Sequence, residues 1–274
     1  MAHTVDISIH LIAGTEVYPV DVVEWLDGIG VESYDPDYEN KTDAELLTEL
    51  AGRRCYMSFE PGLNPNVTKI RENLAEYLEN ILKSAHGSVL EHSSYTFAIE
   101  GVSRVFTGEM NRHRAGVAVS EGSMRYIRLE DMGYWLPPSI SHPSAADGYE
   151  LSQKKAQTKI VIARAFRDAE EHYAELQDIW KDELSPTSKF KSKKEITSMM
   201  RRIVPMGIAT GGIWTMNLRA MRHIITVRTS PHAEEEIAFV FSNILRVLSS
   251  KQPNLFGDFQ EVDGGFYVPK YVKV

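Results

Sequence analysis

The sequence predicts an α+β fold. Residues 93–101 alternate polar and apolar positions as a half-buried strand does, and so does the segment from Val5 to Ala13. Residues 68–86 instead place apolar side chains at helical spacing, and a second long helix is expected over residues 150–182. No repeat, linker or low-complexity segment divides the 274 residues, so we expect a single domain over residues 1–274.

The N-terminal half is expected to begin with a strand. Its apolar residues share one face, and they are Val5, Ile7, Ile9 and Leu11. The helix over residues 68–86 follows, with Gly87 placed for a left-handed cap. After the strand over residues 93–101, we expect a helix over residues 101–113 that delivers Arg112, His113 and Arg114 at its end.

The middle of the chain is expected to contain a loop and two helices. Residues 137–147 are polar and rich in turn-forming residues, which predicts a surface loop before the helix over residues 150–182. The lysine-rich residues 189–195 lead into another helix, which must stop or kink near Pro205. We interpret these lysines as a solvated face.

The C-terminal part is expected to be helical. A helical stretch follows the glycines at 211 and 212 and carries Asn217 to Arg228. Ser230 is placed to cap a last long helix, with Pro231 at its first position. The acids Glu234 to Glu236 then lie near the positive end of the helix dipole.

The composition indicates a globular enzyme of the cytoplasm. Apolar residues make up 43% and charged residues 25% of the chain, and no apolar run could span a bilayer. The N-terminus lacks the features of a signal peptide. The single cysteine excludes an internal disulfide, and neither it nor the histidine spacing predicts a metal site. A net charge of −8 argues against nucleic acid and membranes as partners.

Two arginine-rich segments stand out in this acidic chain. Residues 201–228 hold five arginines and no acid, and residues 103–128 hold five more against only Glu109 and Glu121. Because the planar guanidinium matches phosphate and carboxylate oxygens, these segments favour a phosphate-bearing small molecule as ligand. The alternative is that the arginines pair with acids from elsewhere in the fold.

The motif Arg112-His113-Arg114, followed by Ser123 and then Arg125-Tyr126, resembles the signature of flavin-dependent thymidylate synthases. Upstream, LAGRRCY and LEHSSYTF are similar to the N-terminal half of that family. Downstream, RRIVP, NLRAMRH, VRTSPHAEEE and FGDF are similar to its C-terminal half, in the same order. The resemblance covers most of residues 45–260 and implies an antiparallel sheet with flanking long helices, in a homotetramer with shared active sites.

One departure from the family pattern concerns the loop after the triplet. Eight residues separate Arg114 from Ser123, where family members usually have seven, and the early serine of this stretch is replaced by Val117 or Ala118. The insertion shifts the register of the loop. Simple specificity for a deoxyribonucleotide is therefore an open question at this point.

The resemblance implies reductive methylation of a uridine 5′-monophosphate at C5. Family members use FAD as cofactor, methylenetetrahydrofolate as carbon donor and NADPH as reductant, and the leading substrate is dUMP. The nearest alternative is the same chemistry on UMP, and another is a flavin- or nucleotide-binding protein without activity. A nucleic-acid-binding module is a third class, which the net charge disfavours.

The family's site residues carry over to matching positions of this chain. The residues implied for the nucleotide are Glu109, Arg112, Glu121, Ser123, Arg125, Arg201 and Arg228. Those implied for FAD are Ser94, Arg112, His113, Arg114, Glu121, Asn217, Arg219 and His223. Arg228 is the implied catalytic residue, because a cation at the pyrimidine edge stabilises charge that develops on the ring. Arg125 and Arg201 match phosphate-binding positions.

Several of these residues have a second interpretation. Glu109 is equally compatible with a helix-surface acid, and Arg228 with an ion pair to Glu234 or Glu235. His92 matches a family histidine near the flavin or folate, while a lone histidine at a strand start is more often structural. Cys55 has arginine neighbours that could activate a thiol, but its segment matches a structural helix, so we expect a packing role.

Overall fold

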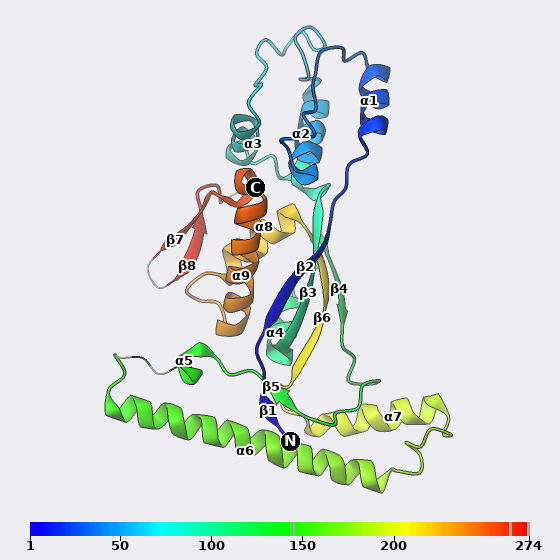
Figure 1. The fold of residues 1–274 in the computed structure, drawn as a ribbon, viewed down its shortest axis with the longest axis vertical. Helices are drawn as coiled ribbons and strands as arrows, with labels where there is room; N and C mark the ends of the chain where they lie inside the picture. The colour runs from blue at the N-terminus through cyan, green and yellow to red at the C-terminus, as the bar shows by residue number, and fades with distance from the viewer. Residues whose placement is uncertain (143, 145, 263–264, 273–274) are drawn as a thin grey trace. The chain divides into compact units, whose positions relative to one another are not determined.

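A computed structural model describes residues 1–142, 144, 146–262 and 265–272 (Figure 1). The chain divides into two compact units. Unit 1 comprises Met1–Ile9, Ala98–Arg112 and Val119–Ile213. Unit 2 comprises His10–Phe97, His113–Ala118 and Trp214–Val274. The single domain expected from the sequence stays a prediction.

The main sheet has four strands in the order β2-β3-β6-β4. Its strands are β2 (Ser8–Gly14), β3 (Ser94–Ser103), β4 (Val117–Glu121) and β6 (Ala209–Asn217). Two further sheets have two strands each: β1 (His3–Thr4) pairs in parallel with β5 (Gly133–Tyr134), and β7 (Phe259–Val262) pairs antiparallel with β8 (Phe266–Pro269). The α+β class with an antiparallel sheet is confirmed.

Unit 1 packs helices against a small core. Its helices are α4 (Arg104–Met110), α5 (Pro138–Ser141), α6 (Tyr149–Ile179), α7 (Phe190–Met200) and the 3-10 turn η2 (Arg201–Ile203). The long helix α6 buries Phe166, Ala169 and Tyr173 against Tyr134 and neighbouring apolar residues. The rings of Phe166 and Tyr134 stack with centroids 4.4 Å apart. This stack attaches α6 to the strand pair β1–β5.

Unit 2 contains helices from both ends of the chain. They are α1 (Pro19–Gly28), α2 (Asp43–Tyr56), α3 (Leu74–Lys83), η1 (Gly87–Glu91), α8 (Leu218–Arg228), α9 (Glu235–Lys251) and α10 (Pro253–Phe256). Helix α2 begins with a capping box, in which the side chains of Thr42 and Glu45 each accept a hydrogen bond from the other's backbone N–H. Helix α9 buries apolar residues at helical spacing, from Ile237 to Leu248.

Several predicted elements are confirmed. The strand predicted over residues 93–101 is β3, and the helix predicted over residues 150–182 is α6. The lysine-rich residues 189–195 lie within α7 from Phe190 onward instead of preceding it, and the η2 turn ends at Ile203, before Pro205, as expected. Among the described residues, no helix is long and apolar enough to cross a membrane.

The first two predicted elements begin later than expected. The first regular strand of the main sheet starts at Ser8 and not at Val5. The helix predicted from residue 68 starts at Leu74, because the Asn73 side chain accepts a hydrogen bond from the Glu76 N–H and caps it there. The left-handed residue after this helix is Ala85, with φ 57°, so the cap predicted at Gly87 is wrong.

The helix predicted over residues 101–113 is shorter than expected. Gly101, with φ 78°, still belongs to β3, where a Cβ would lie 2.2 Å from the Asp6 carbonyl oxygen. Ser103 then caps α4 by accepting hydrogen bonds from the N–H groups of Val105 and Phe106. The helix ends at Met110, so Arg112 to Arg114 follow it and are not part of its last turn, where the sequence predicted them.

Three further predictions need correction. Within the predicted loop 137–147, residues 138–141 form α5, and Pro143 and Ala145 lie outside the described residues. The strand β6 was not predicted before the helix that carries Arg228. The cap of α9 is Glu234, whose carboxylate accepts hydrogen bonds from the N–H groups of Glu236 and Ile237, so the cap predicted at Ser230 is wrong.

Candidate active site

Unit 1 contains an open pocket of about 600 Å³ that is lined by cations. Its lining residues are Arg104, Glu121, Ser123, Met124, Arg201 and Arg202. Glu121, Ser123 and Arg201 were predicted from the sequence, and the structure brings these three together. Arg104 and Arg202 were not predicted as site residues. Both lie in the arginine-rich segments, but chain spacing alone does not show which arginines face one pocket.

An ion pair forms one wall of this pocket. Arg104 Nη1 lies 2.7 Å from Glu121 Oε1, and the second guanidinium nitrogen of Arg104 donates to the Gly122 carbonyl. The side chains of Arg104 and Glu121 are 18% and 26% exposed, so the pair is only partly screened by water. The alternative interpretation of the arginine-rich segments, pairing with acids, therefore applies to Arg104.

Arg201 and Arg202 lie on the exposed η2 turn at the end of α7. Neither has an ion pair to an acid within the part of the chain that the structure describes. Their charge is therefore available in the pocket. A pocket with two uncommitted guanidinium groups suits an anionic group such as a phosphate.

Arg125 lies on the exposed turn that follows Ser123. Its Nε donates to Ser198 Oγ on α7 at 3.1 Å, and its side chain does not line the pocket described above. The neighbouring ring of Tyr126 has Lys194 above it at 5.1 Å. A hydrogen bond with this ammonium group lowers the pKa of the Tyr126 phenol. The Arg-Tyr part of the motif thus contacts α7.

Glu109 and Arg112 lie at the end of α4, with Arg112 Nη1 3.6 Å from Glu109 Oε1. The Arg112 side chain is 72% exposed, so a surface pair of this kind contributes little to stability. Both residues belong to unit 1, but neither lines the pocket at Arg201.

In unit 2, the predicted catalytic residue Arg228 and the predicted flavin residue His223 both lie against His113. The Arg228 Nε donates to His113 Nε2 at 2.8 Å, and the rings of His113 and His223 meet edge to face with centroids 6.1 Å apart. Arg228 and His223 both lie on α8. This helix therefore presents a guanidinium and an imidazole to the histidine of the triplet motif.

Asn217 connects this cluster to the loop after the triplet. Its N–H donates to the Gly116 carbonyl at 2.9 Å, and its Oδ1 accepts from the Ala220 N–H to cap α8. Gly116 has φ 68°, and a Cβ there would lie 2.5 Å from Asn217 Nδ2. Only glycine allows the loop and the Asn217 amide to approach this closely.

Two other residues predicted for the flavin lie at the start of β3 and on α8. They are Ser94 and Arg219. Arg219 forms an ion pair with Glu91 at 2.5 Å. Glu91 directly precedes His92 in the chain, and His92 is exposed. The backbone of Ser94 exchanges hydrogen bonds with Thr15. Arg114 is exposed.

Cys55 lies on the last turn of α2 and is exposed. The helix expected at its position is confirmed, but the packing role expected for the thiol is wrong. Among the described residues, no group of three His, Cys, Asp or Glu side chains could hold a metal ion.

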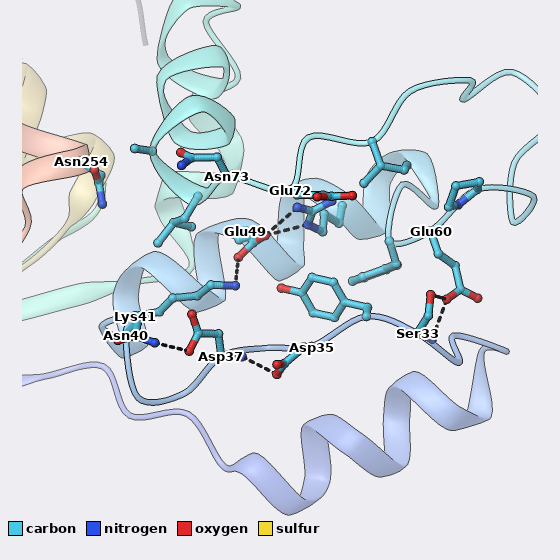
Figure 2. A pocket seen from close by; sticks show the side chains of 17 residues that line it. Ser33, Asp35, Asp37, Asn40, Lys41, Glu49, Glu60, Glu72, Asn73 and Asn254 are labelled. Carbon is cyan, nitrogen blue, oxygen red and sulfur yellow. Dashed lines mark hydrogen bonds and ion pairs between the residues drawn. The ribbon is translucent and has the colours of Figure 1, made fainter.

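Unit 2 also contains a larger pocket, of about 730 Å³, that holds none of the predicted site residues (Figure 2). Figure 2 shows Asp35, Asp37 and Glu60 along its rim. Asp37 accepts a hydrogen bond from the Asn40 amide, and Glu60 accepts from the backbone N–H of Ser33. Asp37 is therefore engaged within its own loop, and Glu60 with the segment that precedes α2.

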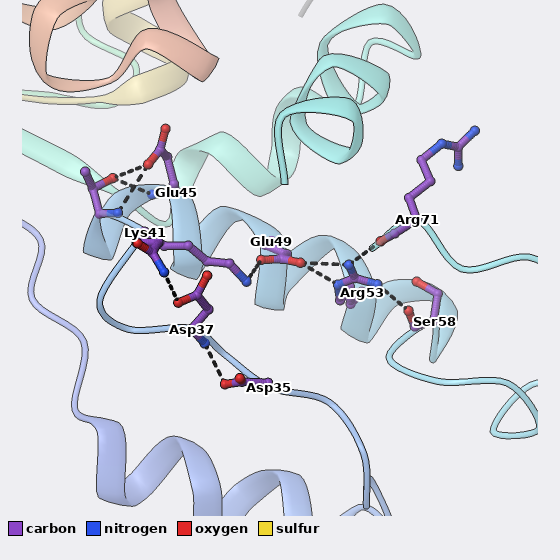
Figure 3. Close-up of polar contacts among 10 residues, drawn as sticks. Asp35, Asp37, Lys41, Glu45, Glu49, Arg53, Ser58 and Arg71 are labelled. Carbon is purple, nitrogen blue, oxygen red and sulfur yellow. Dashed lines mark hydrogen bonds and ion pairs between the residues drawn. The ribbon is translucent and has the colours of Figure 1, made fainter. Parts of the chain in front are cut away.

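Behind this rim lies a buried ion network on α2 (Figure 3). Glu49 accepts from Lys41 at 2.8 Å and forms an ion pair with Arg53 at 2.7 Å. Arg53 also donates to the carbonyls of Ser58 and Arg71, which fixes the irregular segment after α2. Burial raises the pKa of the neighbouring Tyr77 to about 12. The charges satisfy one another, so we interpret this pocket wall as structural.

The fold and the arginine pocket of unit 1 together indicate which class of protein this chain belongs to. It is a mixed helix-and-sheet protein with a cationic pocket suited to a small phosphorylated molecule. Its second unit adds a separate set of imidazole, amide and guanidinium groups.

Comparison with known proteins gives the family. Residues 38–254 match the family described as thymidylate synthase complementing protein. The chain is 36% identical over 225 residues to a probable flavin-dependent thymidylate synthase of Mycobacterium phage D29. This match covers 82% of this chain and 87% of the relative. The chain is 31% identical over 262 residues to the flavin-dependent thymidylate synthase of Corynebacterium efficiens, with 95% and 92% covered. The chain therefore belongs to the flavin-dependent thymidylate synthase family.

A solved structure supports the fold. The UMP/dUMP methylase PolB from Streptomyces cacaoi, bound with 5-Br dUMP, is similar with a TM-score of 0.63. The match covers 94% of this chain and 96% of that chain at 18% identity. The same protein bound with 5-Br UMP is similar to the same extent, with a TM-score of 0.63 at 17% identity.

Proposed function

We propose that this protein is a flavin-dependent methyltransferase that converts dUMP to dTMP by reductive methylation at C5. Methylenetetrahydrofolate is the proposed carbon donor and NADPH the proposed reductant. The proposal also includes a homotetramer with active sites shared between subunits, for which family membership is the support, and a cytoplasmic location, for which the composition is the support.

The arginine pocket of unit 1 is the observation that carries this proposal. Arg201 and Arg202 supply permanent positive charge and forked donors for the 5′-phosphate of the nucleotide. Ser123 supplies a hydroxyl on the same wall. We propose that Arg125, Glu109 and Arg112 contact the nucleotide from the neighbouring segments.

The proposed catalytic residue is Arg228. Methylation at C5 requires negative charge to develop on the pyrimidine ring and a proton to leave C5. A fixed guanidinium stabilises that charge. The backbone of Arg228 is part of α8, and the hydrogen bond from its Nε to His113 holds the side chain in place. The neutral His113 accepts this bond, which leaves its other ring nitrogen able to donate.

The residues of unit 2 fit a flavin. Arg114 and Arg219 supply cations for the pyrophosphate, while His113, Asn217 and His223 supply neutral groups for ring heteroatoms. Ser94 completes the set from unit 2, and Arg112 and Glu121 of unit 1 are also proposed for the flavin. Gly116 leaves space that a Cβ would fill beside the Asn217 amide. When bound, a reduced flavin supplies the hydride that makes a methyl group from a transferred methylene.

UMP is a second candidate substrate, because the loop after the triplet is unusual. Residues 117–121 of the eight-residue stretch between Arg114 and Ser123 form the edge strand β4, and the strand ends at Glu121 on the pocket wall. The longer stretch thus ends next to the proposed nucleotide site and could change how the sugar is accepted.

An activity assay tests the proposal. The purified flavin-bound protein is supplied with NADPH, methylenetetrahydrofolate and either dUMP or UMP, and the methylated product is followed by mass. Product from dUMP supports the proposal, and a strong preference for UMP would replace dUMP by UMP as substrate. Bound FAD without NADPH oxidation or product would indicate a binding protein instead.

A further inference from the structure

Arg104 lines the unit 1 pocket, although the sequence did not predict it as a site residue. It lies at the first position of α4, and the Ser103 cap fixes the backbone on both sides of it. Its own N–H donates to the Ile208 carbonyl at 3.3 Å. The Ser103 cap and the hydrogen bond to Ile208 therefore fix the backbone position from which the guanidinium extends.

The guanidinium holds two consecutive groups of the loop. One nitrogen pairs with the Glu121 carboxylate, and another donates to the Gly122 carbonyl. Gly122 is held from its other side, because its N–H donates to the Gly211 carbonyl at 2.9 Å. Arg104 thus fixes the end of β4 at the point where the loop enters the pocket.

Charge gives a second reason for this contact. A carboxylate in a pocket for an anion repels the ligand, and it also attracts the arginines that should bind the ligand. Glu121 shares its pocket with Arg201 and Arg202. The ion pair with Arg104 neutralises Glu121 and leaves the other two arginines uncommitted.

The pair is also incompletely satisfied. The Nε of Arg104 and the Oε2 of Glu121 are buried and have no hydrogen-bond partner. A buried polar atom without a partner costs free energy, which favours a ligand that supplies one. Such a pair is a feature of a binding site more than of a structural core.

We propose that Arg104 is a positioning residue for the nucleotide site, which holds Glu121 and Gly122 and keeps Arg201 and Arg202 available for the phosphate. This inference rests on the function proposed above. Arg104 acts through Glu121, so removing both members of the pair should be less harmful than removing Arg104 alone.

The test measures binding of dUMP and of UMP to the flavin-bound protein by titration calorimetry. Arg104→Met should weaken binding of the preferred nucleotide about 10-fold, since about 1.4 kcal/mol corresponds to a tenfold change. Arg104→Lys keeps the charge but loses the fork, so it should weaken binding less. The double variant Arg104→Met/Glu121→Gln should bind more tightly than Arg104→Met, because a neutral amide does not compete for Arg201 and Arg202.

In steady-state kinetics, the loss in Arg104→Met should fall mainly on KM, with kcat changed by less than about threefold. Arg167→Met, which removes an exposed arginine of α6, is the control for loss of a positive charge in the same unit. Its binding should equal that of the wild type. If Arg104→Met does not fold, Arg104→Gln and Arg104→Gln/Glu121→Gln give the same comparison.

Two results would overturn the inference. One is nucleotide binding by Arg104→Met within twofold of the wild type. The other is a double variant that binds no better than Arg104→Met, which is what a purely structural role predicts. Failure of the wild type to bind either nucleotide would instead overturn the proposed function, and this inference with it.

Discussion

The hydrogen bond between Arg228 and His113 joins two motifs that are 115 positions apart in the chain. At this scale, single side chains decide what the site can do. Arg228 has a fixed partner at 2.8 Å, and a preorganised cation stabilises developing charge without reorganisation. Gly116 is a second residue at which one atom decides the local structure, because the absence of a Cβ there allows the close contact with Asn217.

Replacement of Arg228 by alanine should lower turnover about 100-fold or more, because one preorganised donor is lost. FAD should stay bound, since the other predicted flavin residues are retained. Turnover and the flavin absorbance of the purified variant are the measurements. Near-normal turnover would show that another residue stabilises the charge on the pyrimidine ring.

Replacement of Gly116 by alanine should destabilise the protein by about 2 kcal/mol or more, because it combines a positive φ with a steric clash. The Cβ would displace the Asn217 amide, so flavin content should fall as well. Chemical denaturation and flavin content are the measurements. Gly28→Ala is the matched control, because a Cβ at Gly28 meets nothing within 4 Å. Equal effects of the two changes would contradict the argument.

At the scale of elements, caps decide where the helices begin. Asn73, Ser103, Asn217 and Glu234 each accept hydrogen bonds from N–H groups in the first turn of a helix. A cap satisfies donors that the helix itself leaves unpaired. Because several residues near a helix start can compete for this role, only the structure identified Glu234 in place of Ser230.

Replacement of Glu234 by alanine should therefore cost about 1 kcal/mol of the free energy of unfolding. Ser230→Ala should cost about half a kcal/mol or less, because Ser230 only donates a hydrogen bond to the Val227 carbonyl at the end of α8. Urea denaturation of both variants makes the comparison. A larger loss for Ser230→Ala would restore the cap predicted from the sequence.

The buried network on α2 makes a second prediction for this scale. Arg53→Ala should destabilise the protein by about 3 kcal/mol, because the buried Glu49 loses one of its two cationic partners and the carbonyls of Ser58 and Arg71 lose their donor. Arg54→Ala, one residue further along the same helix, should change stability by about 0.5 kcal/mol or less, since Arg54 is exposed. Thermal melting distinguishes the two. Similar losses would mean that the network contributes little.

At the scale of the whole molecule, the two compact units share strands. The unit boundaries at residues 9/10, 97/98 and 213/214 fall inside β2, β3 and β6. A further boundary, at 118/119, falls inside β4, so each unit contains part of all four strands of this sheet. The single domain stays a prediction.

We expect calorimetry of the purified protein to show one cooperative unfolding transition, because neither unit could unfold without breaking strands that the other also uses. A calorimetric enthalpy equal to the van't Hoff enthalpy per cooperative unit would agree with this. Two separated transitions would contradict the single-domain prediction.

The sequence alone determined the α+β class, the long helix at α6, the strand β3 and the family. These follow from periodicity and from motifs, which are local in the chain. The residues Glu121, Ser123 and Arg201 were also identified by their motifs, and the structure places them in one pocket.

Only the tertiary structure showed that Arg104 pairs with Glu121 and that Arg53 is the centre of a buried network. It also decided that β6 is a strand and that Cys55 is exposed. The physical reason is that a partner, a pocket wall and burial depend on residues distant in the chain. A sequence pattern records the type of side chain at each position, and the fold decides which charges it meets.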